Sequence, residues 1–133
     1  MAVEDEYLDV LHGIESAIVA TYRDLPEITD YEVIRALEAV IDSYKAEERG
    51  RTPREFSPSS TEAALYDTIR LVCQWWLGRA EDSDEADDLG PAPKPIRVDE
   101  ILLCLKKILT SVNRWTRSGG RTGYLTFIVQ YVR

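Results

Sequence analysis

The sequence predicts an all-α fold, an irregular bundle of four or five helices with an acidic, proline-containing loop between the third and fourth helices. Two observations support this class. Apolar residues recur at steps of three and four in five separate segments. Glycine, proline and capping patterns separate these segments. The chain has 133 residues, 44% of them hydrophobic, which is enough to bury one core, so we expect a single helical domain over residues 1–133.

The strongest helical signal covers residues 99–115. Acidic residues at its start, and Gly119 and Gly120 beyond its end, match the charge and the stop expected at the two ends of a helix. On one side of this helix the apolar residues recur with helical spacing, which predicts a buried face. They are Ile101, Leu102, Leu105, Ile108, Leu109, Val112 and Trp115. The opposite side predicts an exposed basic strip and carries Lys106, Lys107, Arg114 and Arg117.

Two further helices are predicted in the first fifty residues. The first covers residues 4–24, because Pro26 prevents its continuation. The second begins at a capping box, in which Thr29 and Glu32 satisfy backbone donors at the helix start. It ends before Gly50, a residue that favours the left-handed conformation found after many helices.

A third helix is predicted between a connection over residues 51–60 and Gly78. Leu71 and Trp75 lie on an apolar arc of their own, apart from the main stripe. A helix that is apolar on two sides is typical of a central position in a bundle or of an interface, and central packing is the favoured interpretation. Leu71 and Trp75 are the candidate interface residues. The main stripe consists of Leu65, Ile69, Val72 and Trp76.

The composition changes over residues 80–95, where clustered acidic residues are followed by prolines. Like charges repel and such a segment has little to bury, so it predicts a flexible acidic linker rather than a cation site. We expect this linker to mask the basic strip at low salt. A short final helix is predicted over residues 121–132, after the turn at Gly119 and Gly120.

The start of the chain is acidic, unlike the basic and apolar start of a secretory signal, and no apolar run approaches the ~20 residues that span a membrane. We therefore expect a cytoplasmic protein that does not insert into membranes. Cys73 and Cys104 each lie at the edge of an apolar helical face, without metal-binding spacing. We expect both to be buried and reduced. A disulfide between them would form only if the two helices pack side by side.

Few residues favour catalysis. His12, the only histidine, is predicted to face solvent, which disfavours a metal role. Glu38 and Asp42 are four residues apart and would suit Mg²⁺ in a helical nucleotide hydrolase. Arg35 and Lys45 lie beside them, however, and charge compensation explains the pair. The sequence also lacks a phosphate-binding glycine loop and a nucleophile motif, so we expect no metal and no cofactor, and an enzyme is disfavoured.

Basic and aromatic residues alternate around the turn at Gly119 and Gly120. Backbone amides at a glycine turn next to a helix start, with arginines nearby, are typical of an anion site. The net charge of −8 disfavours nucleic acid as the anion. The candidate residues for binding an anion or a partner are Lys106, Lys107, Arg114, Arg117 and Arg121.

A resemblance to a family of small helical bacterial proteins with no assigned function is carried by two stretches, EYLDVLHGIESAIVATYRDLPEITDYEVIRALEAVIDSY and KKILTSVNRWTRSGGRTGYLTFIVQYV. It implies a bacterial source and supplies no functional residues. From the residues themselves we expect a non-catalytic interaction or structural protein that self-associates or binds a protein partner. The alternatives are a Mg²⁺-dependent nucleotide hydrolase, and anion or nucleic-acid binding through the basic carboxyl-terminal segment.

Overall fold

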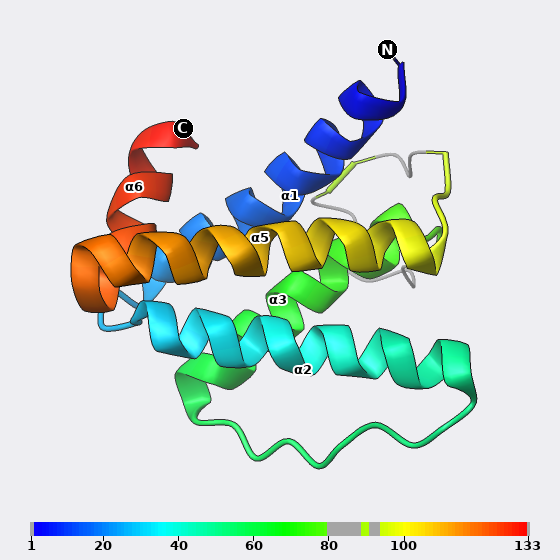
Figure 1. The fold of residues 1–133 in the computed structure, drawn as a ribbon, viewed down its shortest axis with the longest axis horizontal. Helices are drawn as coiled ribbons and strands as arrows, with labels where there is room; N and C mark the ends of the chain where they lie inside the picture. Colours follow the sequence, from blue (N-terminus) through cyan, green and yellow to red (C-terminus); the bar gives the residue numbers. More distant parts are fainter. Residues whose placement is uncertain (1, 80–88, 91–93, 133) are drawn as a thin grey trace.

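The computed structural model describes residues 2–79, 89–90 and 94–132, and within them every regular element is helical (Figure 1). The predicted irregular all-α bundle is therefore confirmed. No helix in this part of the chain is long and apolar enough to cross a membrane. The elements in chain order are α1 (Ala2–Asp24), α2 (Asp30–Arg49), α3 (Ser60–Trp76), α5 (Val98–Gly119), the 3₁₀ helix η1 (Gly120–Thr122) and α6 (Gly123–Tyr131).

The helices form two layers. Figure 1 shows α2 and α5 side by side and running in opposite directions, with α1 and α3 crossing behind them. The short helix α6 packs on the carboxyl-terminal end of α5. It diverges from the amino-terminal half of α1, so that these two helices point away from each other above α5. An apolar groove lies where these helices meet α5.

Local capping interactions explain where α2 and α3 begin and where α2 ends. The Thr29 amide donates to the Glu32 carboxylate over 3.1 Å, as the predicted capping box requires. Ser59 caps α3 in the same way, since its amide donates to the Glu62 carboxylate over 2.9 Å and its hydroxyl accepts from the Glu62 amide over 3.2 Å. Gly50 ends α2 with a φ of 64°, a conformation that glycine adopts without steric cost.

The predicted apolar faces meet in one core between the two layers. The carboxyl-terminal helices contribute to it as well as the amino-terminal ones, and α6 inserts buried side chains that include Tyr124. The side chains with less than 2% exposure include Ile14 and Ile18 of α1, Leu37 and Tyr44 of α2, Leu65 and Ile69 of α3, Ile101 and Leu105 of α5, and Leu125 and Ile128 of α6.

Some element boundaries differ from the prediction. Helix α1 begins at Ala2 instead of residue 4, whereas α5 continues to Gly119 and ends at the predicted glycine stop. The final helix starts at Gly123 rather than at Arg121, since residues 120–122 form the 3₁₀ turn that joins it to α5. The predicted acidic linker lies for the most part outside the described residues, and so does its predicted contact with the basic strip.

Candidate functional site

An apolar groove of about 350 Å³ lies where α1, α5 and α6 meet, and we call it the α1/α6 groove. Two large apolar residues at its edges are exposed, Leu8 of α1 by 49% and Tyr131 of α6 by 56%. This is where the two helices diverge. The groove is lined by Leu8, Leu11, His12, Glu15, Lys107, Ile108, Ser111, Phe127 and Tyr131.

Aromatic contacts hold the α6 side of the groove in place. The rings of Trp115 and Phe127 stack with their centroids 4.1 Å apart, and Phe127 in turn stacks on Tyr131 at 5.9 Å. The His12 imidazole of α1 meets the Tyr131 ring edge-on at 5.7 Å. Aromatic pairs at such distances are attractive, so the exposed Tyr131 ring belongs to an ordered row rather than to a loose helix end.

Four of the residues that line the α1/α6 groove are polar or charged, namely His12, Glu15, Lys107 and Ser111. Burial raises the pKa of the Glu15 carboxyl, and the nearby His12 partly offsets this by lowering it. The Lys107 ammonium lies 5.9 Å from the centre of the Tyr7 ring, a cation–π distance. Within the described residues, no three His, Cys, Asp or Glu side chains gather in a metal-binding arrangement. The groove thus combines apolar walls with a small set of charged side chains.

The predicted interface residues Leu71 and Trp75 lie on α3, away from this groove, and both are half-buried. The Trp75 ring packs edge-on against Trp76 with centroids 5.2 Å apart, and its indole N–H donates to the Gly90 carbonyl over 3.4 Å. Trp75 is therefore partly engaged by its own chain. Its role in an interface stays a prediction.

The predicted basic strip does not converge on one site. Lys106, Lys107, Arg114, Arg117 and Arg121 are all exposed. Lys107 borders the α1/α6 groove, whereas Lys106 borders a different cavity between α2 and α5. The strip follows the outer face of α5, as the periodicity predicted, and its binding of an anion or a partner stays a prediction.

An acidic side chain of the protein itself, Asp30, already binds the helix start after the glycine turn. The sequence patterns did not predict this contact. Asp30 is fully buried, and its carboxylate accepts from the amides of Tyr124 over 2.8 Å and Leu125 over 3.2 Å. The Thr116 hydroxyl also donates to it over 2.7 Å. The only sequence signal for this role was an acidic residue in the first turn of α2, which ordinary helix capping explains equally well.

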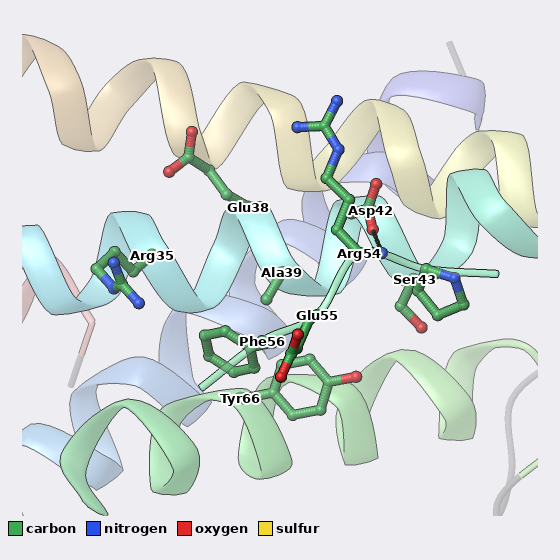
Figure 2. Close-up of a pocket in the computed structure, with 10 residues that line it drawn as sticks. Arg35, Glu38, Ala39, Asp42, Ser43, Arg54, Glu55, Phe56 and Tyr66 are labelled. Carbon is green, nitrogen blue, oxygen red and sulfur yellow. Dashed lines mark hydrogen bonds between the residues drawn. The ribbon is translucent and has the colours of Figure 1, made fainter. Parts of the chain in front are cut away.

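Of the acidic pair Glu38 and Asp42, the structure compensates Asp42, but through other residues than expected. Figure 2 shows the Asp42 carboxylate beside the Arg54 backbone, whose amide donates to it over 2.7 Å. The Arg51 guanidinium donates to the other carboxylate oxygen over 2.9 Å. These bonds lower the pKa of Asp42, which therefore stays ionised. The expected neighbour Arg35 pairs instead with Glu62 of α3 at 2.6 Å, because its side chain extends across to that helix.

Both cysteines are buried and free, as predicted. Burial raises the pKa of the Cys104 thiol to about 11, and burial likewise raises the pKa of Cys73. A thiol held protonated at neutral pH is a weak nucleophile, so neither residue is poised for covalent chemistry.

Comparisons with models of protein families, with functionally characterised proteins and with solved structures give no match for this chain.

Proposed function

We propose that this protein is a non-catalytic interaction protein that self-associates through the α1/α6 groove. The observation that carries the proposal is the pairing of Leu8 and Tyr131, exposed by 49% and 56%, at the edges of one apolar groove. Single exposed apolar residues are ordinary on a protein surface, whereas apolar residues gathered around a groove are typical of an interface.

The composition of the groove supports a protein as the occupant. Aromatic side chains in well-packed surroundings supply much of the binding energy in many interfaces. Phe127 and Tyr131 lie in an ordered aromatic row, so their burial by a partner would cost little conformational entropy. Leu8 and Leu11 add aliphatic surface on the opposite side.

A second copy of the chain is the occupant that these residues favour. A two-fold interface requires a surface that is complementary to itself. The two diverging helices each present an apolar edge, so two copies related by a two-fold axis can bury Leu8 and Tyr131 of both. The groove also carries opposite charges, Glu15 from α1 and Lys107 from α5, which the same axis can bring together.

The setting that we propose is the bacterial cytoplasm. The two free thiols and the family resemblance support this setting. A Mg²⁺-dependent hydrolase is the weaker alternative, because both Asp42 oxygens already accept hydrogen bonds from the chain itself.

Sedimentation equilibrium over a range of protein concentrations tests the proposal. We expect the wild type to dimerise and the double variant Leu8→Ser with Tyr131→Ser to stay monomeric. The matched control is Leu103→Ser with Tyr31→Ser, since these residues are exposed by 49% and 54% outside the groove. The control should dimerise like the wild type. A monomeric wild type at all concentrations, or equal behaviour of the two double variants, would contradict the proposal.

The α3 patch supplies a second candidate interface, because Leu71 and Trp75 are only half-buried and lie outside the main core. Leu71→Ser separates the two surfaces in the same experiment. If Leu71→Ser abolishes the dimer and the Leu8 and Tyr131 double variant retains it, self-association occurs through α3.

A further inference from the structure

A second cavity, of about 320 Å³, lies between α2, the connection after it and α5, and we call it the basic groove. Its walls come from three segments that are distant in the sequence. Two further residues, Ile41 and Leu109, contribute an apolar floor. The cationic side chains that line the groove are Lys45 and Arg49 of α2, Arg51 and Arg54 of the connection, and Lys106 of α5.

The groove carries an excess of positive charge. Among the residues that the structure describes, five cationic side chains and two carboxylates line it, which leaves three positive charges in excess. Asp42 accounts for one carboxylate and pairs with Arg51 at 2.9 Å. Within the part of the chain that the structure describes, the side chains of Lys45, Arg49 and Lys106 form no ion pair. This local excess contrasts with the net charge of −8 of the whole chain.

The connection is held in place over the groove. The Asp42 carboxylate binds the Arg54 amide over 2.7 Å, and the Phe56 ring packs on Tyr66 of α3 with centroids 5.3 Å apart. Figure 2 shows that the Arg54 guanidinium and the Glu38 carboxylate both extend toward α5. The hydrogen bond to Asp42 thus engages only the backbone amide of Arg54, and the Arg54 guanidinium still lines the groove. A preorganised set of cations loses less entropy on binding an anion than a mobile one does.

We infer that the basic groove binds a small anion that carries two adjacent phosphoryl groups. Guanidinium groups bind phosphate oxygens in pairs, and lysines add compact positive charge, so this mixture of side chains suits phosphoryl groups. Two phosphoryl groups carry roughly three to four negative charges at neutral pH, which matches the three excess charges of the groove.

The surroundings favour a small molecule over a nucleic acid. A short anion is attracted by charges within about 10 Å, whereas a long polyanion also meets the acidic remainder of the surface. No aromatic side chain lines the basic groove, so bases would find no surface on which to stack.

Isothermal titration calorimetry with inorganic pyrophosphate at low ionic strength tests the inference. The double variant Arg49→Gln with Lys106→Gln removes two groove cations that are exposed and unpaired among the described residues. We expect it to weaken binding by about tenfold or more. The control, Arg23→Gln with Lys94→Gln, makes the same change in net charge at exposed positions outside the groove. It should bind within about twofold of the wild type.

Two further ligands test whether the basic groove recognises the phosphoryl groups of a small anion. Citrate carries about three negative charges on carboxylates and should bind more weakly than pyrophosphate if phosphoryl geometry matters. A single-stranded oligonucleotide should also bind more weakly. The inference is overturned if the wild type does not bind pyrophosphate, if both double variants lose affinity equally, if citrate binds as tightly, or if the oligonucleotide binds more tightly. None of these outcomes depends on dimerisation, because the α1/α6 groove shares no lining residue with the basic groove.

Discussion

The buried carboxylate of Asp30 joins α2 to the two carboxyl-terminal helices, α5 and α6. It lies in the first turn of α2 and accepts hydrogen bonds from Thr116 of α5 and from the first amides of α6. The amino-terminal amides of a helix have no partner within their own helix and attract negative charge. Asp30 therefore both satisfies these donors and determines where α6 docks.

Replacement of Asp30 by Ala should lower the free energy of unfolding by roughly 3 kcal/mol, because it leaves the buried Tyr124 and Leu125 amides without an acceptor. Urea denaturation followed by circular dichroism measures this change. Thr116→Val removes one donor and should cost only about 1 kcal/mol. Equal losses in the two variants would show that Asp30 does not act as the cap of α6.

Glu15 should make stability depend on pH in the direction opposite to most carboxylates. Burial raises its folded-state pKa above the unfolded value, so the folded protein binds the proton more tightly. The resulting stability is absent at neutral pH and is gained as the pH falls through the folded-state pKa. Glu15→Gln should therefore be more stable than the wild type at pH 7. Urea denaturation at several pH values should show the difference shrinking as the pH is lowered.

At the scale of elements, the joint between α5 and α6 depends on one glycine. A Cβ atom at Gly123 would overlap the Trp115 carbonyl group, so only glycine permits this close approach of the two helices. The approach also brings Trp115 and Phe127 into their stack at 4.1 Å. The packing of α6, and with it one side of the α1/α6 groove, follows from this contact.

Gly123→Ala should lower the free energy of unfolding by about 3 kcal/mol, because the helices must separate to relieve the overlap. Gly119→Ala is the matched control, since a Cβ atom there meets nothing within 4 Å. Thermal denaturation measures both variants. A Gly123→Ala protein as stable as the control would show that α6 does not need to lie this close to α5.

At the scale of the whole molecule, electrostatics should reduce stability. The chain carries a net charge of −8, and most of the ion pairs of the described residues are exposed, so each contributes little. Raising sodium chloride from about 20 mM to about 500 mM screens the repulsion and should increase Tm by a few degrees. Scanning calorimetry checks this, and a Tm that falls with salt would indicate that ion pairs dominate instead.

Much of the fold could be predicted because the signals that begin and end helices are local. The Thr29 and Glu32 capping box, the stop at Gly50 and the apolar stripe of α5 each depend on residues a few positions apart. The same periodicity separated the core face of α5 from its basic face. Composition also predicted that both cysteines would be buried.

The candidate sites could be predicted only in part. The sequence identified Lys106 and Lys107 as basic surface residues, yet the structure assigns them to different grooves. It identified Asp42 as one member of an acidic pair, whereas its partners Arg51 and Arg54 come from a connection without periodicity. Leu8 carried no signal of its own. Tyr131 lies on the apolar face of the final helix, which predicts burial, yet it is 56% exposed because α6 diverges from α1.

The sequence by itself determined which segments are helical, which faces are apolar and where the net charge lies, because neighbouring residues decide these properties. Only the tertiary structure decided which helices meet and at what angle. Asp30 lies 94 positions from the Tyr124 amide that it binds, and Gly123 affects packing through a carbonyl group of another helix. Such contacts follow from the packing of all side chains together, and no short pattern of residues specifies them.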